Sequence, residues 1–358
     1  MRTGRPGPVH VDITKDALQQ ETDAPHPTTE QVIAGLPGFR PNLGGHPRQL
    51  KLIAEEIAKA HRPIILAGHG ILIANATEEL RALAEKARIP VAWTLLGIGA
   101  MDETHPLAYG YMGMHGWKHV NRAIQASDLI VAVGMRFDDR VTGSVRTYAP
   151  YARIIHVDID PAEIGKNVAV DIPVVGDVKH VMVELNKELR TLKEPWDAIR
   201  KSWQKQIDAW RDERPLTYEP SDEVIKPQFV IEKLYELTGG DAIIVTDVGQ
   251  HQMWAAQFFK YDTPRNWLSS GGLGTMGYGL PAAIGAKLAC PDKPVACVSG
   301  DGSFQMCVQE LMTATVYGLP VISSISPGNG NLGTSFTVTL TGSARWMKTA
   351  RSYGVTSC

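Results

Sequence analysis

An aspartate between two glycines follows an apolar segment late in the sequence. The run Gly300-Asp301-Gly302-Ser303-Phe304 comes directly after Pro294 to Ser299, which has the composition of a buried strand. Ligands of open α/β sheets bind at the carboxyl ends of strands, and the helix expected from Phe304 to about Tyr317 would turn its amino end toward an anion. A lone carboxylate would repel a phosphate, so the pattern predicts a hard cation such as Mg²⁺ between them.

A second oxygen ligand for this cation is expected at the end of the next strand. That strand is predicted from Val321 to about Ile325, and Asn329 is the candidate ligand. The Gly-Asp-Gly run alone is a weak signal for a metal. The preceding strand, the following helix and an asparagine about 28 positions later make a stronger pattern. Together they predict a magnesium and diphosphate site.

Two α/β units must position these residues. Near-continuous apolar strands alternate with amphipathic helices over residues 46–190, and a similar unit begins near Lys226. Such strands are typical of parallel sheets that helices cover on both faces. The predicted fold is therefore α/β, with two doubly wound parallel-sheet domains. Buried strands are expected at Pro63 to Gly68, Pro90 to Trp93, Asp128 to Gly134, Arg153 to Asp158, Asp241 to Asp247 and Pro294 to Ser299.

The remaining segments flank or connect the two units. In residues 1–45, the alternation of Pro8 to Ile13 predicts a strand, followed by a loop to Gly45. Residues 191–226 are expected to be a helical connector, and residues 227–358 the second domain. Trp196, Trp203 and Trp210 share one helical face of the connector. A stripe at this spacing is more often packing than a ligand site.

Composition excludes several classes of function. The formal net charge is -2 with scattered Lys and Arg, so the basic footprint of a nucleic-acid-binding protein is absent. No apolar run is long enough to cross a membrane, and no signal peptide is evident. The four cysteines form no C-x-x-C pair, which favours free thiols in a reducing compartment. A cytoplasmic location is expected.

The Gly-Asp-Gly-Ser run with its later asparagine resembles the diphosphate and Mg²⁺ motif of thiamine-diphosphate enzymes. That resemblance implies that Asp301, Asn329 and the carbonyl of Asn331 hold the metal. It also implies that Met276 is the apolar wedge that keeps the cofactor bent. The implied thiamine-diphosphate contacts are Val248, Gly249, Gln250 and His251, then Gly274, Thr275 and Met276, then Gly302 and Ser303.

The middle segments resemble the FAD-contacting loops of acetolactate synthase. Arg136 and Arg140 could pair with the FAD diphosphate, and Asp158 could accept a hydrogen bond from a ribose hydroxyl. A solvated charge run at a strand end is the alternative for these arginines, and His69, His115 and His251 could be ordinary loop histidines. The implied FAD residues are Gly68, His69, Gly70, Thr94, Leu95, Met114, His115, Gly134, Arg136, Asp138, Arg140, Val141, Asp158, Ile159 and Asp177, which assigns residues 46–190 as an FAD-binding middle domain.

The resemblance implies a function. Acetolactate synthase decarboxylates pyruvate on thiamine diphosphate and condenses the hydroxyethyl unit with a second 2-keto acid, pyruvate or 2-ketobutyrate. This is the first step of branched-chain amino-acid biosynthesis, leading to valine, leucine and isoleucine. A homo-oligomer with a small regulatory subunit is implied for a full-length form. Family members begin with a pyrimidine-binding domain that supplies an activating Glu.

No residue of this sequence matches that Glu, so no catalytic residue is assigned. The sequence is therefore expected to be a fragment that lacks the N-terminal domain and the usual C-terminal end, since residues 334–358 do not resemble the family. Two alternatives remain open. One is a catalytically inactive fragment that binds FAD and Mg²⁺-diphosphate. The other is a related FAD-containing enzyme such as pyruvate oxidase or glyoxylate carboligase.

Overall fold

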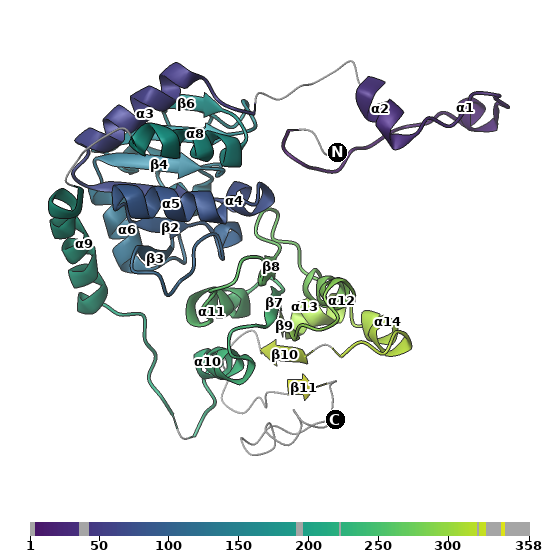
Figure 1. Cartoon of the computed structure of the whole chain (residues 1–358). Helices are drawn as coiled ribbons and strands as arrows, with labels where there is room; N and C mark the ends of the chain where they lie inside the picture. Colours follow the sequence, from purple (N-terminus) through teal and green to yellow (C-terminus); the bar gives the residue numbers. More distant parts are fainter. Residues whose placement is uncertain are drawn as a thin grey trace.

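The computed structural model describes residues 4–35, 43–190, 196–221, 223–320, 322–326 and 338–340. These residues form two sheets, and helices cover both faces of each (Figure 1). The first sheet belongs to the middle part of the chain and the second to the later part. The predicted α/β class with two doubly wound sheets is confirmed.

The first sheet is parallel and has six strands in the order β3-β2-β1-β4-β5-β6. Neighbouring residues of a strand point to opposite faces. Ile65 and Val131 therefore join one apolar cluster, while Ile64 and Ile130 join another. The strands are β1 (Pro63–Ala67), β2 (Val91–Trp93), β3 (Ala108–Tyr111), β4 (Leu129–Val133), β5 (Arg153–Asp158) and β6 (Ile172–Val175).

Helices α3, α5 and α8 cover one face of this sheet, and α6 and α9 cover the other. Three short helices, α4, α7 and the 3-10 turn η1, follow strands directly and carry predicted site residues. The bounds are α3 (Pro47–Lys59), α4 (His69–Ile73), α5 (Thr77–Ala87), η1 (Leu95–Gly97), α6 (Lys118–Ala126), α7 (Asp139–Thr142), η2 (Val145–Thr147), α8 (Val178–Arg190) and α9 (Trp196–Glu213).

Helix α9 of the predicted connector packs on the first sheet. The Trp203 indole donates to the carbonyl of Pro63 at 3.0 Å, and Trp203 is buried. The Arg200 guanidinium is fully buried and donates to the carbonyls of Ile57 and Ala87, near the carboxyl ends of α3 and α5. Trp196 is also buried. The tryptophan stripe is therefore packing, as the spacing predicts.

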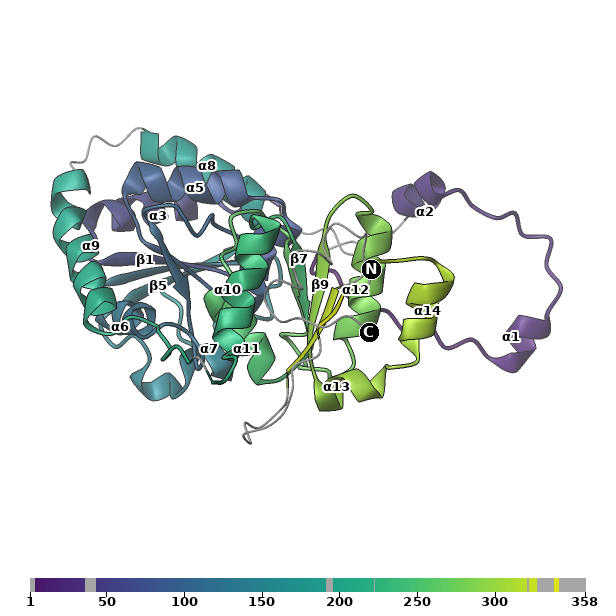
Figure 2. The same ribbon diagram turned by 90° about the horizontal axis from the view of Figure 1, so that it is seen from below.

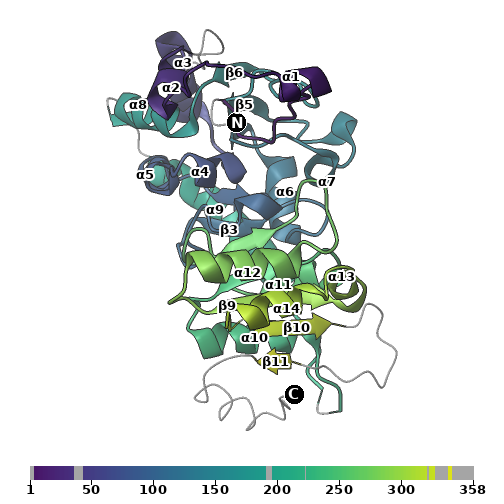
Figure 3. The same cartoon turned by 90° about the vertical axis from the view of Figure 1, so that its right-hand side faces the viewer.

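The second sheet has the order β11-β10-β9-β7-β8, and all its pairs except β10 with β11 are parallel. Helices α10 and α11 cover one face, and α12 and α14 cover the other, where Figure 3 shows them in front of the sheet. The elements are α10 (Pro227–Thr238), β7 (Ile243–Thr246), α11 (Gln250–Phe258), β8 (Trp267–Ser269), α12 (Gly279–Ala289), β9 (Val295–Gly300), α13 (Asp301–Met306), α14 (Glu310–Val316), β10 (Ile322–Ser326) and β11 (Val338–Leu340).

One apolar cluster continues from the first sheet unit into the second. It includes Ile98 and Leu107 from the first unit and Phe259, Tyr261 and Trp267 from the second. Hydrogen bonds cross the same seam, which Figure 2 shows from below: Arg265 Nη2 donates to the carbonyl of Leu72 at 2.7 Å, and Gln257 Nε2 to that of His115 at 2.7 Å. The two units are thus joined by a common core.

Two local predictions were wrong. Residues 8–13 form no strand, because a strand requires a hydrogen-bonded neighbour and their apolar side chains, Val9, Val11 and Ile13, are exposed. Two short helices, α1 (Lys15–Gln19) and α2 (Thr29–Gly35), interrupt the expected loop. The single helix expected from Phe304 to Tyr317 is divided into α13 and α14 by the turn at 307–309.

Two further findings concern the composition. Cys290, Cys297 and Cys307 are free, and of these Cys297 is buried while the other two are half-buried. Cys358 lies outside the described residues. Within the part of the chain that the structure describes, no helix is long and apolar enough to cross a membrane.

Candidate functional site

Each sheet has one point where the chain reverses the direction in which it adds strands. In the first sheet, β2 lies on one side of β1 and β4 on the other. In the second sheet, β8 and β9 lie on opposite sides of β7. Loops that leave such adjacent strands in opposite directions open a crevice at their carboxyl ends. The predicted site residues follow these strands, so the topology gives one candidate site per sheet.

At the first crevice, the loops after β1 and β4 touch through glycines. A Cβ added at Gly68 would lie 2.1 Å from the carbonyl oxygen of Gly134, and one at Gly70 would lie 2.7 Å from the Gly134 Cα. Gly134 itself has a φ of +61°, which favours glycine. Only glycines permit this approach, so the backbone forms the floor of the crevice.

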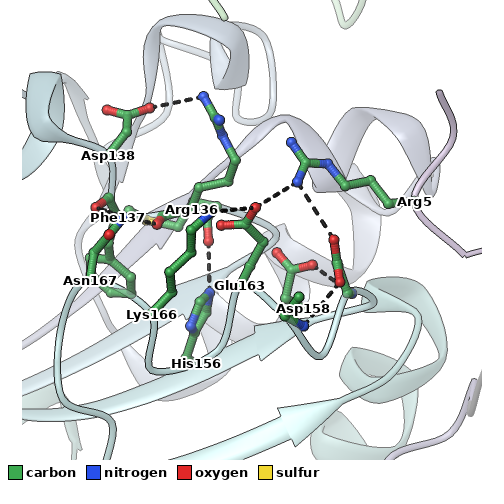
Figure 4. Close-up of polar contacts among 12 residues, drawn as sticks. Arg5, Arg136, Phe137, Asp138, His156, Asp158, Glu163, Lys166 and Asn167 are labelled. Atoms are coloured by element: carbon green, nitrogen blue, oxygen red, sulfur yellow. Dashed lines mark hydrogen bonds and ion pairs between the residues drawn. The ribbon is translucent and has the colours of Figure 1, made fainter. Parts of the chain in front are cut away.

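Arg136 and Asp138 lie in the loop that follows β4, just after Gly134 (Figure 4). Their side chains form an ion pair at 3.3 Å. Asp138 also caps α7, because its carboxylate accepts from the amide of Val141 at 3.2 Å. Between them, Phe137 has a φ of +51°, and the Asn167 side chain donates to its carbonyl at 3.0 Å. A specific hydrogen bond thus holds an uncommon backbone conformation, and Arg136 is presented at the crevice edge.

Asp158 ends β5 and is buried. Burial raises the pKa of its carboxyl to about 6, against the lowering effects of the Asp160 amide and of Arg5. The Arg5 guanidinium lies 2.8 Å from the Glu163 carboxylate and 3.6 Å from that of Asp160 (Figure 4). Sequence reasoning missed Arg5 and Glu163, because 158 positions separate them and neither carries a motif.

Further predicted FAD residues lie around this crevice or on the seam. A pocket of about 300 Å³ is lined by Met114, Arg140 and Val141, among others. Thr94 begins η1 by accepting from the amide of Gly97 at 3.1 Å, and His69 Nδ1 lies 2.8 Å from the carbonyl oxygen of Leu96. The remaining four are Leu95, the half-buried first residue of η1, His115, whose carbonyl accepts a hydrogen bond across the seam, Ile159 after β5, and Asp177, whose carboxylate binds His180 at 2.8 Å.

At the second crevice, three predicted segments converge. Ser303 is buried, and its hydroxyl donates to the carbonyl of Val248 at 3.4 Å. A Cβ at Gly302 would lie 3.8 Å from Cε of Met276, and one at Gly274 would lie 3.8 Å from Cγ1 of Val248. The structure therefore brings 248–251, 274–276 and 301–303 together.

His251 lies in α11 under this convergence. Its ring is buried, and its Nε2 has no hydrogen-bond partner. Burial lowers the pKa of His251, while the charges of Asp247 and Asp301 act in the opposite direction. The ring packs on Gly249, where a Cβ would lie 2.8 Å from its Cε1. Gln250 begins the helix and is exposed. A buried imidazole nitrogen without a partner is an open position for a ligand.

Asp301 is exposed at the first position of α13, directly after β9. Asn329 and Asn331, the other predicted metal ligands, lie outside the described residues. Among the residues that are described, no three His, Cys, Asp or Glu side chains gather as a metal cluster. A site with one carboxylate is what Mg²⁺ uses when phosphate oxygens complete its shell.

Asp247 also belongs to this site and was missed. It directly follows β7, is 1% exposed, and accepts hydrogen bonds from the backbone amides of Gly277 and Gly279. The sequence shows it only as the last residue of a predicted strand, because its partners lie 30 and 32 positions away.

The sequence matches two family models that correspond to these two units. Residues 50–185 match "Thiamine pyrophosphate enzyme, central domain", and residues 247–356 match "Thiamine pyrophosphate enzyme, C-terminal TPP binding domain". The first model covers the whole first sheet, and the second covers the second sheet except β7. The second match also reaches residue 356, so the expectation that residues 334–358 do not resemble the family was wrong. The chain belongs to the thiamine pyrophosphate enzymes.

Within that family, the chain is similar to several curated acetolactate synthases. The chain is 49% identical to "Acetolactate synthase" of Mycobacterium leprae (strain TN), over 92% of this chain and 52% of the relative. It is 45% identical to "Probable acetolactate synthase large subunit" of Methanococcus aeolicus, over 99% of this chain and 63% of the relative. It is also 45% identical to "Acetolactate synthase isozyme 3 large subunit" of Escherichia coli (strain K12), over 89% of this chain and 56% of the relative.

The chain is therefore a homologue of the acetolactate synthase large subunit. It spans between about half and two thirds of the length of these relatives.

Proposed function

We propose that this chain carries the FAD-binding and thiamine-diphosphate-binding units of an acetolactate synthase large subunit. Residues 46–190 are the FAD-binding domain, 191–226 the connector and 227–358 the thiamine-diphosphate domain. The observation that carries the proposal is the second crevice, where the segments 248–251, 274–276 and 301–303 converge and His251 Nε2 is buried without a partner. Relatives named acetolactate synthase support the reaction class.

The second crevice fits thiamine diphosphate with Mg²⁺. Asp301 would hold the metal, together with Asn329 and the carbonyl of Asn331. His251 Nε2 and the amides at the start of α13 would receive the diphosphate, and Met276 would support the ring system. When bound, thiamine diphosphate supplies the nucleophilic carbon that releases CO₂ from one 2-keto acid and transfers the remaining two-carbon unit to another.

The residues of this chain orient that coenzyme and control its surroundings. Because burial lowers the pKa of His251, its imidazole is neutral near pH 7 and offers one N–H to an anion. Ser303 is tied to Val248, which fixes the start of α13 against the loop after β7. Met276 is 42% exposed and gives the crevice an apolar side. These groups bind and orient, and none of them is assigned a catalytic proton transfer.

The first crevice fits FAD. The glycine floor at Gly68 and Gly134 lets a dinucleotide approach the backbone closely, as at other switch points of this strand order. Arg136 and Arg140 would face its diphosphate, and Asp158 would accept from a ribose hydroxyl. We propose a structural role for FAD, because the net carboligation transfers no electrons.

We further propose pyruvate and 2-ketobutyrate as substrates, a homo-oligomer with a small regulatory subunit, and a cytoplasmic setting. The relatives' designation as large subunits supports the subunit proposal.

The test is product formation from pyruvate by the purified chain with thiamine diphosphate, Mg²⁺ and FAD. Because no residue of the chain is assigned as the activating Glu, the expected result is retained FAD without product. Acetolactate that forms and then disappears in the Asp301→Ala variant, but not in Asp292→Ala, would show that the chain carries the whole reaction. Asp292 is an exposed aspartate on a nearby turn and is the matched control. Acetyl phosphate or tartronate semialdehyde as product would instead indicate a pyruvate oxidase or a glyoxylate carboligase. Retained yellow FAD without any product would limit the chain to binding.

A further inference from the structure

The Asp247 carboxylate binds three backbone amides at the second crevice. Its Oδ1 accepts from the amides of Val248 at 3.0 Å and Gly277 at 2.9 Å, and its Oδ2 accepts from that of Gly279 at 2.9 Å. The residue is 1% exposed. A carboxylate so far from water requires such partners, and these charge-assisted bonds are stronger than bonds between neutral groups. Asp247 therefore fixes where the 277–279 segment lies relative to β7.

The same carboxylate completes the amino end of α12. Tyr278, the residue before the helix, makes no capping hydrogen bond with its side chain. Asp247 takes over that role, since it accepts from Gly279, the first residue of the helix, and places a negative charge at the positive end of the helix dipole. A Cβ at Gly279 would lie 2.9 Å from Asp247 Oδ2, so glycine is needed there for the contact.

These contacts hold Met276 from both sides. On one side, the amide of Thr275 donates to the Ser270 hydroxyl at 2.8 Å. On the other, the amide of Gly277 donates to Asp247. Cε of Met276 reaches the space above Gly302, 3.8 Å from where a Cβ would lie. The gap between Met276 and the start of α13 is therefore set by the backbone around Met276 and not by packing alone.

We propose that Asp247 is a positioning residue for the ring end of thiamine diphosphate. This inference rests on the proposed function, because its ligand is the thiamine diphosphate that we assign to this crevice. Asp247 acts through Gly277 and Gly279 on Met276, whereas Asp301 would act on the diphosphate end through the metal that it holds. The two ends of one ligand thus depend on different carboxylates.

The Asp247→Asn variant tests whether binding of the ring end of thiamine diphosphate can be weakened while binding of its diphosphate end is kept. An Asn side chain has nearly the same shape, but its NH₂ group would face the amide of Gly279, so one charge-assisted hydrogen bond becomes a donor-donor contact. Calorimetric titration of the full chain with Mg²⁺ and thiamine diphosphate, and separately with Mg²⁺ and inorganic pyrophosphate, gives two dissociation constants. Pyrophosphate reports the diphosphate end alone.

The Asp247→Asn variant is expected to lose about tenfold to hundredfold in affinity for thiamine diphosphate, the range for one hydrogen bond to a charged group. Its affinity for pyrophosphate should change by no more than about twofold. Gly279→Ala should give the same pattern, because it strains the same contact while it keeps the carboxylate. Asp241→Asn is the matched control: Asp241 precedes the same strand, is exposed and pairs with Lys293.

If Asp247 only caps α12 and does not position the ligand, we expect a different result. Asp247→Asn and Gly279→Ala would then lower the thermal midpoint and either spare both affinities or weaken both equally, which would overturn the inference. If the unaltered chain bound thiamine diphosphate no more tightly than pyrophosphate, the proposed function itself would fail. A different outcome would overturn only the role of Asp247. In that case the unaltered chain binds thiamine diphosphate more tightly than pyrophosphate, and the variants show the same difference in affinity.

Discussion

The two crevices have the same topological origin, yet their polar side chains are engaged differently. At the first crevice, charged groups pair with each other, as Arg136 does with Asp138 and Arg5 with Glu163. At the second, Asp247 is engaged by backbone amides and His251 Nε2 has no partner. His156 Nδ1 at the first crevice is likewise buried without a partner, so the crevices differ in their ion pairs and not in having an unpartnered nitrogen. A ligand of the first crevice meets charged side chains that already form ion pairs, whereas the carboxylate of Asp247 at the second is already bound by backbone amides.

The difference has an energetic meaning. The Arg136–Asp138 pair is partly exposed, and such pairs contribute only about 0–1 kcal/mol, so the first crevice can give it up at small cost. A buried nitrogen without a hydrogen bond costs about 1–3 kcal/mol, and a ligand that satisfies it recovers that amount. The first crevice is thus formed in advance by its backbone, and each crevice holds one buried imidazole nitrogen that a ligand could satisfy.

The largest expected effect concerns the stability of the first sheet unit, on which α9 packs. Arg200→Met should lower the free energy of unfolding by about 3–4 kcal/mol, because the buried guanidinium binds carbonyls at the ends of two helices. Urea unfolding measures the change. Lys205→Met, at an exposed position of the same helix, should have little effect. Equal effects of the two variants would show that α9 contributes through packing alone.

Asp301→Ala should weaken binding of Mg²⁺-pyrophosphate by about 100-fold, because the metal would lose its carboxylate. FAD absorbance that stays with the protein through gel filtration should be unchanged. Titration calorimetry gives the first quantity and absorbance the second. A variant that lost both ligands together would contradict the independence of the two crevices.

Gly68→Ala should affect the other ligand, so that FAD is lost and Mg²⁺-pyrophosphate binding is kept. Its Cβ would meet the Gly134 carbonyl oxygen at 2.1 Å, and such overpacking costs about 1–3 kcal/mol. We expect loss of retained FAD with pyrophosphate affinity preserved. Gly285→Ala is the control, since nothing lies within 4 Å of a Cβ there. FAD retained by Gly68→Ala would show that the glycine floor does not contact the ligand.

The smallest effect is a pH dependence from Asp158. Its pKa is raised from 3.8 to about 6 in the folded chain. Between these values the folded chain holds a proton that the unfolded chain has released, so this contribution to stability is full below pH 3.8 and is lost as the pH rises to about 6. Asp158→Asn should remove about 1–2 kcal/mol of that decline, measured by urea unfolding at pH 4.5 and 6.5. Identical slopes in both proteins would mean that the carboxyl titrates normally.

Sequence patterns predicted the sheets well because buried parallel strands are nearly continuous apolar runs, as in Ile64 to Ala67 and Val295 to Val298. They missed β3, β6 and β8, which are short, and β3 carries Gly110 in its interior. Residues with a motif, such as Asp301 and Met276, could be proposed for the site from the sequence. Arg5, Glu163 and Asp247 could not, because their contacts depend on which distant segments the fold brings together.

The apolar cluster that runs from Ile98 through Tyr261 to Trp267 has a consequence for modularity. Two domains with separate cores can be exchanged between relatives, but these two share side chains across their seam. A chimera that takes its central unit from one relative and its thiamine unit from another would place two mismatched surfaces against each other. Such hybrids should fold only when the residues around 95–107 and 253–271 come from the same parent.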